Sequence, residues 1–132
     1  MIYFDSCAFF KLVQPEEHRA ALVEYVRESR MPWVASELLQ VEVLRVLNRG
    51  RITEKSWRWT KDLLGRVALL PVGDVIQRAC EIPPASIRSL DAVHLATALS
   101  VRPELTAFIT YDKRLEEAAA AHELPVVVPR DS

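Results

Sequence analysis

Four acidic residues in this chain stand at positions from which their carboxylates can act together. Two follow short apolar runs typical of buried strands, and two lie within segments with helical periodicity. Carboxylates that crowd into one site repel each other unless a cation offsets their charge. A divalent cation bound by such a site can promote the hydrolysis of phosphate esters by water. The candidate catalytic residues are Asp5, Glu42, Asp91 and Asp112.

Asp5 and Asp112 are expected at the same edge of a sheet. Asp5 directly follows the apolar run 2–4, and Asp112 follows the run 107–109. Sites in open parallel sheets lie beyond the carboxyl ends of the strands, so neighbouring strands would bring the two acids together. Taken singly, Asp5, Asp91 and Asp112 also have a structural explanation, because acids are common at helix caps and in first helical turns.

Glu42 is the most informative acid, because it lies within a predicted helix that runs from Ser36 to about residue 49. Leu38 and Val46 share its face at one-turn spacing, so we expect an apolar setting in which an ionised carboxylate needs a partner. One interpretation is an ion pair with Arg45 or Arg49. The other is a carboxylate directed at a metal site.

The segment 89–99 predicts a helix in which Ser89 caps the first turn and Asp91 lies at the rim of the core. Its buried stripe is expected to contain Leu90, Val93, Ala96 and Leu99. His94 follows Asp91 at a spacing that some di-metal sites use, but matching glutamate-rich helices are missing. We therefore expect His94 to bond a backbone group or a carboxylate.

An all-oxygen ligand set favours Mg²⁺ or Mn²⁺ over zinc. Asp5, Asp91 and Asp112 are the expected metal ligands, and Ser6 and Thr110 stand beside them, where they can hold a water or orient a ligand. The chemistry that suits this arrangement is phosphodiester hydrolysis by metal-activated water, which requires no protein nucleophile.

The length of 132 residues predicts a single domain, residues 1–132. Strands and helices alternate, which favours an α/β fold with three layers: a central parallel sheet and helices on both faces. Strands are predicted at 2–4, 32–36, 67–72, 107–109 and 125–128. Helices are predicted at 7–13, 16–30, 36–49, 53–65, 74–82, 89–99 and 113–122, with Asp74 as a cap.

The net charge of −1 gives no global basic field, so any contact with nucleic acid must be local. Four arginines near the acids can contact RNA phosphates, although ordinary solvated surface explains them equally simply. They are Arg45, Arg49, Arg51 and Arg88.

Two features bear on the environment and partners of the chain. Cys7 and Cys80 are expected to be buried free thiols, and with neither a signal peptide nor a membrane-length apolar run, the chain is expected to be cytoplasmic. Trp57 and Trp59 place apolar groups on more than one face of the predicted helix 53–65. Core packing explains them, but this helix is also the candidate partner or dimer surface.

Four segments together resemble the PIN-domain family, specifically the VapC-type toxins of bacterial toxin–antitoxin pairs. They are Ile2 to Leu12, Ser36 to Arg45, Ser89 to Ala98 and Ile109 to Leu115. The resemblance implies an Mg²⁺- or Mn²⁺-dependent endoribonuclease with Asp5, Glu42, Asp91 and Asp112 as its acidic site. It also implies a cognate antitoxin that covers the site, and a homodimer. Cys7 departs from the family, which usually has Ser, Thr or Asn there.

Two other functions stay open at this point. A phosphate-ester hydrolase for small molecules would use the same acids. A catalytically silent module that binds RNA or protein would fit Cys7, a poor ligand for a hard cation, and the near-neutral charge.

Overall fold

A computed structural model describes residues 1–50 and 52–132 and places five parallel strands in one sheet, in the order β3-β2-β1-β4-β5. The strands are β1 (Ile2–Phe4), β2 (Trp33–Ser36), β3 (Val67–Leu70), β4 (Ala107–Ile109) and β5 (Val126–Val127). β1 is central and pairs with β4 in the register Tyr3↔Phe108. The first and fourth strands are therefore neighbours, which is the condition under which Asp5 and Asp112 would meet.

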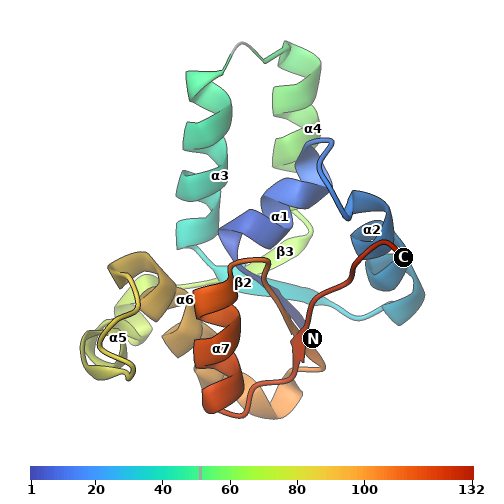
Figure 1. Ribbon diagram of the computed structural model, residues 1–132. Helices are drawn as coiled ribbons and strands as arrows, with labels where there is room; N and C mark the ends of the chain where they lie inside the picture. The colour runs from blue at the N-terminus through green and yellow to red at the C-terminus, as the bar shows by residue number, and fades with distance from the viewer. Residues whose placement is uncertain (51) are drawn as a thin grey trace.

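Helices cover both faces of the sheet, which confirms the three-layer α/β/α architecture (Figure 1). They are α1 (Ser6–Val13), α2 (Arg19–Ser29), α3 (Leu38–Arg49), α4 (Glu54–Leu64), α5 (Ile76–Glu81), α6 (Ser89–Ser100) and α7 (Lys113–Ala121), with 3₁₀ turns at Val72–Asp74 and Arg102–Glu104. The side chains of α1 to α4 pack on one face of the sheet, and those of α5 to α7 pack on the other. Successive strand residues point to opposite faces, so Phe4 enters the first core and Tyr3 the second.

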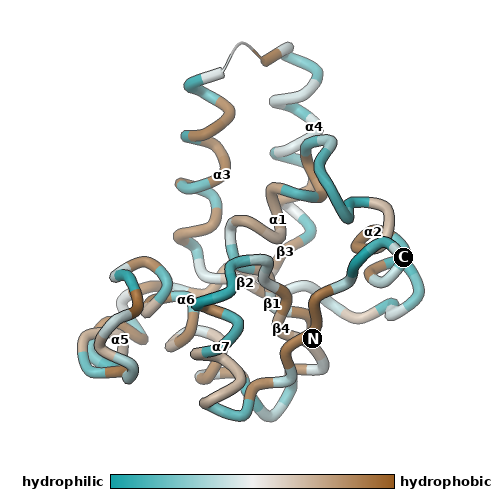
Figure 2. The backbone as a smooth tube through the Cα atoms, in the orientation of Figure 1, coloured by the Kyte–Doolittle hydropathy of each residue, from teal (hydrophilic) through white to brown (hydrophobic). Residues whose placement is uncertain are grey.

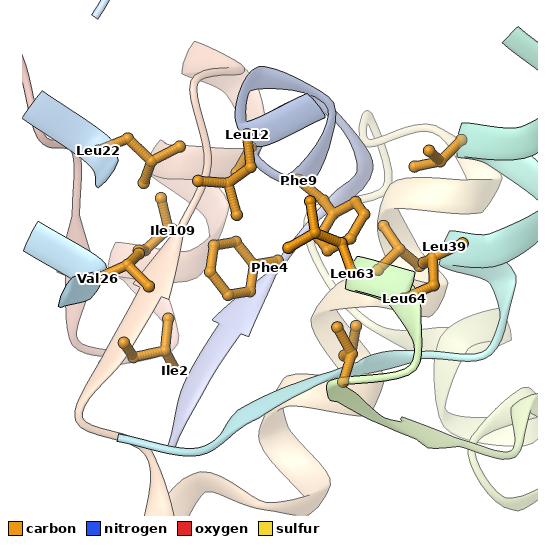
Figure 3. Close-up of a cluster of buried hydrophobic side chains, with 14 of the residues drawn as sticks. Ile2, Phe4, Phe9, Leu12, Leu22, Val26, Leu39, Leu63, Leu64 and Ile109 are labelled. Atoms are coloured by element: carbon orange, nitrogen blue, oxygen red, sulfur yellow. The ribbon is translucent and has the colours of Figure 1, made fainter. Parts of the chain in front are cut away.

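The first core is built around the aromatic side chains that flank the start of α1 (Figure 3). Phe4 lies edge-on to Phe9 with ring centroids 6.1 Å apart, and edge-on to Trp33 at 5.4 Å. Hydrophobic residues are concentrated at β1 and β4 in the middle of the molecule (Figure 2). This packing fixes the direction in which β1 passes into α1, and so fixes the position of Asp5.

The start of α6 differs from the prediction. Ser89 is its first helical residue and does not cap it; Arg88 takes the N-cap position, and its side chain makes no capping hydrogen bond. Leu90, expected to be buried, is 49% exposed, and Val93 is only partly buried. Residues 94 to 99 are all buried because α6 packs against β2, α5 and α7, whereas its first turn lines the cavity at the strand ends.

Smaller corrections concern the segments around β2 and β3. The strand predicted at 67–72 ends at Leu70 because Pro71 has no N–H for the ladder. Asp74 lies in a 3₁₀ turn, and α5 begins after Val75 without a side-chain cap. Ser36 ends β2, and Glu37 holds the N-cap position of α3, although the Ser36 hydroxyl still accepts the Leu38 N–H at 3.1 Å.

The packing of α3 predicts unequal effects for two of its aliphatic side chains. Leu39 is fully buried, so Leu39→Ala is expected to lower the free energy of unfolding by about 2–5 kcal/mol through lost contacts and a cavity. Val41 on the same helix is 56% exposed, and Val41→Ala should change it by less than about 0.5 kcal/mol. Urea denaturation of both variants measures the difference; equal effects would contradict the placement of α3.

Candidate active site at the carboxyl ends of the strands

The four candidate acids line one cavity of about 310 Å³ at the carboxyl ends of β1 and β4. Asp5 follows β1, Asp112 precedes α7, Asp91 lies in the first turn of α6, and Glu42 comes from the middle of α3. The structure therefore brings together acids that are far apart in the chain. The other lining residues are Ser6, Cys7, Arg88, Ser89 and Leu90.

Asp5 combines a structural and a site position. Its Oδ1 accepts the Ala8 N–H at 2.8 Å and so caps α1, while Oδ2 accepts a short hydrogen bond from the Thr110 hydroxyl. The carboxylate is 3% exposed, and this burial raises the pKa of Asp5 although both hydrogen bonds oppose the shift. Thr110 also accepts the backbone N–H of Asp112 at 3.1 Å, so this buried hydroxyl joins two of the four acids.

Asp112 and Asp91 both line the cavity, but they differ in the hydrogen bonds that their carboxylates accept. Oδ1 of Asp112 accepts the N–H groups of Arg114 and Leu115 at 2.9 and 3.1 Å, which caps α7. Asp91 does not cap α6, and its carboxylate is half-buried. Burial, followed by repulsion from the Asp112 charge, raises the pKa of Asp91. Asp91 thus lacks the capping hydrogen bonds that Asp5 and Asp112 make.

Glu42 is held by a histidine. Its Oε1 lies 2.7 Å from Nε2 of His94, so of the two interpretations the pair with Arg45 or Arg49 is wrong. The expectation that His94 bonds a carboxylate is confirmed. The apolar face of α3 is formed by other residues (Leu39, Val43 and Leu47), and Glu42 lies beside this face with 19% of its side chain exposed.

The PIN domain family matches residues 2–121 of this chain. Ribonuclease VapC35 of Mycobacterium tuberculosis is 37% identical over 98% of this chain and 97% of its own length. Ribonuclease VapC46 of the same species is 38% identical over 97% of each chain, and Ribonuclease VapC47 is 39% identical over 87% of each. The chain belongs to the PIN-domain family, in its VapC group.

Cys7 lies within the acidic site of this PIN domain. Its thiol contacts both carboxylate oxygens of Asp5 at 3.3 Å, and its sulfur accepts the Tyr111 N–H at 3.4 Å. Burial and the neighbouring charge of Asp5 raise the pKa of Cys7 to about 12, so the thiol stays protonated at neutral pH. Both thiols are free, as expected, but neither is fully buried: Cys7 is partly buried, and Cys80 is exposed on the short helix α5.

The predicted RNA contacts divide into two groups. Arg88 lines the acidic cavity of the PIN domain, whereas Arg45 and Arg49 are exposed on α3 and are not among the lining residues. Arg51 lies outside the described residues. The helices α3 and α4 project side by side from the rest of the molecule (Figure 1), so Arg45 and Arg49 lie on a projecting helix.

The chemistry of the donor set fits a hard divalent cation. The carboxylates supply oxygen ligands, and the charge of Asp112 raises the pKa of Asp91, a repulsion that a cation would relieve. Within residues 1–50 and 52–132, no three Asp, Glu, His or Cys side chains lie close enough to form a finished metal site. Binding would therefore need the side chains to draw together. In the same residues no helix is long and apolar enough to span a membrane.

Tyr3 is connected to the site, although the apolar run 2–4 does not single it out. Its hydroxyl lies 2.8 Å from Nδ1 of His94. The available signal was chemical: a tyrosine in a strand buried on both faces needs a hydrogen-bond partner for its hydroxyl.

The raised pKa of Asp91 predicts that this acid destabilises the metal-free protein. Its folded pKa exceeds the ordinary 3.8, so the free energy of unfolding falls as pH rises from that value through the folded pKa, and it stays lower above it. Asp91→Asn should remove this loss and raise the melting temperature at pH 7. Mn²⁺ should reduce the difference in melting temperature between the variant and the parent, because the ion would stabilise the parent. A lower melting temperature would instead indicate a helix-stabilising acid.

Proposed function

We propose that this protein is a metal-dependent endoribonuclease that acts in the cytoplasm as the toxin of a toxin–antitoxin pair. The observation that carries the proposal is the meeting of four carboxylates in one cavity at the strand ends of a PIN domain. The full-length similarity to relatives named ribonucleases supports RNA as the substrate. Positions in the cavity support the roles proposed for the four acids, Ser6 and Arg88.

Asp5, Asp91 and Asp112 are proposed to hold Mg²⁺ or Mn²⁺, and Glu42 is proposed as the fourth catalytic acid. When bound, such an ion polarises a phosphate and lowers the pKa of a bound water. Asp5 and Asp112 suit this role because their capping bonds, through Oδ1 in each case, fix their orientation. Thr110 is proposed to position Asp5, to which it donates, while Ser6 at the cavity wall is proposed to hold a water.

Arg88 is the proposed contact for the RNA backbone at the cavity. It is exposed, it lines the cavity with the acids, and its guanidinium can bind phosphate oxygens that the carboxylates alone would repel. Arg45 and Arg49 are proposed to contact phosphates further along α3.

The proposed protein partners are a cognate antitoxin and a second copy of this chain. The candidate surface for a partner is α4, where Trp59 is 46% exposed and lines a groove of about 440 Å³ with Trp33 and three arginines. Trp57 is partly buried and lies against a different hollow near Leu47. An exposed tryptophan over a groove is typical of interface anchors. This groove shares no lining residue with the acidic cavity.

Asp91→Asn is the sharpest test of the nuclease function, because this acid does not cap α6. Cleavage of single-stranded RNA in Mg²⁺ or Mn²⁺ is expected to fall by about 100-fold or more, because the variant lacks one of the three carboxylates proposed to hold the ion. The same variant is expected to be more stable than the parent, so lost folding cannot explain the loss.

Glu117→Gln is the matched control, since Glu117 is exposed on α7 outside the acidic cavity. It should cleave RNA at the parent rate. Cleavage that survives both Asp91→Asn and a chelator would contradict the proposal. So would faster turnover of a chromogenic phosphate monoester than of RNA, or an absence of Mn²⁺ binding in calorimetry.

Arg88→Ala is expected to weaken RNA binding and to reduce the salt dependence of binding by about one phosphate contact. Fluorescence anisotropy with labelled RNA at several salt concentrations measures both quantities, in the presence of a chelator so that the RNA stays intact. Arg102→Ala serves as the control, because Arg102 pairs with Glu123 outside the cavity. An unchanged salt slope for Arg88→Ala would remove Arg88 from the proposed RNA interface.

A further inference from the structure

A chain of three polar side chains links the centre of the sheet to the cavity. The Tyr3 hydroxyl lies 2.8 Å from Nδ1 of His94, and Nε2 of the same ring lies 2.7 Å from Oε1 of Glu42. Tyr3 and His94 are completely buried, and Glu42 lines the cavity. The three residues belong to β1, α6 and α3, so the chain of hydrogen bonds crosses from the sheet to the site.

The hydrogen atoms in this chain can be assigned from the partners of each group. Nε2 of His94 carries a hydrogen, because a nitrogen lone pair so close to a carboxylate oxygen would be repelled. The Tyr3 oxygen accepts the Ser36 N–H at 3.3 Å, and a phenol hydroxyl ordinarily keeps its proton at neutral pH. Donation of that proton to Nδ1 satisfies both buried groups.

We infer that His94 is a positioning residue for Glu42, and that Tyr3 holds the His94 ring in the form that carries its hydrogen on Nε2. The order of donation runs from the Tyr3 hydroxyl to Nδ1, and from Nε2–H to Oε1 of Glu42. The catalytic consequence rests on the proposed nuclease function, in which Glu42 is one of the acids. The arrangement of hydrogen bonds does not depend on that function.

Glu42 needs such a hold because of its place on α3. This helix rises away from the sheet together with α4 (Figure 1), and a glutamate side chain has three rotatable bonds. Within residues 1–50 and 52–132, His94 is the partner that the structure gives to the Glu42 carboxylate. His94 in turn is completely buried, and Tyr3 of the second core lies edge-on to it with ring centroids 5.9 Å apart.

The bond to His94 also divides the work of the two Glu42 oxygens. Oε1 is occupied by Nε2–H, which leaves Oε2 for the cavity. A neutral donor orients the carboxylate without neutralising it, so the negative charge stays available at the site. A charged partner such as Arg45 would have offset that charge. This explains how a carboxylate on a surface helix can keep a fixed direction among three others.

Nitrogen NMR of the histidine rings tests the hydrogen assignment directly. The full chain, labelled with ¹⁵N, contains three histidines, and His94 is identified by comparison with a His94→Gln sample. The expected signals show a hydrogen on Nε2 and a bare Nδ1 at neutral pH. A hydrogen on Nδ1, in a neutral or a doubly protonated ring, would overturn the inference, and this experiment requires no activity.

Kinetics of RNA cleavage test the positioning role. His94→Leu removes the donor and is expected to lower kcat by roughly 10- to 100-fold, the usual effect of losing a partner that orients a ligand, with little change in KM. His94→Gln retains an N–H that can reach Glu42 and should recover part of the loss. In a Glu42→Gln background, His94→Leu should cause little further loss.

His122→Gln is the matched control, because His122 contacts the Pro83 carbonyl in a different cavity. It should leave kcat unchanged. Parent-like kcat in folded His94→Leu, or a full additional loss in the Glu42→Gln background, would overturn the positioning role. Should His94→Leu fail to fold, the comparison moves to Tyr3→Phe, which keeps the ring stacked on Phe108 at 5.2 Å, and parent-like kcat there has the same meaning.

The two proposals fail in different ways. If the parent protein does not cleave RNA, the nuclease function fails, and the NMR result alone still decides whether His94 holds Glu42. If the parent cleaves RNA and Asp91→Asn does not, while folded His94→Leu cleaves at the parent rate, only the positioning role fails.

Discussion

The parallel pairing of β1 with β4 is the constraint on which the rest of the structure depends. The register places Phe4 opposite Ile109, and the Asp5 N–H reaches the Ile109 carbonyl at 3.4 Å, so the two strands end level. Thr110 can then donate to Asp5, and α1 and α7 both begin at this edge. Had the register slipped by one residue, the side chains of β1 would have exchanged faces, and Asp5 would not face the cavity.

The same carboxylates that form the site also hold the fold together, but to different degrees. Asp5 and Asp112 cap helices, so their charge is compensated by backbone N–H groups. Asp91 receives no such compensation, and Glu42 receives it from a buried ring. The charged form is thus disfavoured at Asp91 by burial and by Asp112, and at Asp5 by burial, and a cation would favour the charged form of both acids. Structural and chemical explanations of an acid are therefore compatible in this site, and two of the four residues satisfy both.

The sequence was sufficient for the order of strands and helices and for the four acids, because apolar periodicity and strand-end position are local properties. It was insufficient where the outcome depended on distant contacts. The partner of Glu42 comes from His94, far along the chain, and no spacing rule connects them. Leu90 fits the apolar stripe of α6 but emerges with the first helical turn at the cavity rim. Cys80 was expected to be buried from its residue type, yet the short helix α5 leaves it at the surface.

The central position of β1 has a consequence for synthesis in the cell. The hydrogen bond between Thr110 and Asp5 joins residues 105 positions apart. It cannot form until β4 and the residues after it have left the ribosome. Closing such a long loop also delays folding, because its entropy is lost before the strand contacts form. A nascent chain therefore lacks a cavity in which its acids can meet until nearly all of its residues have been synthesised.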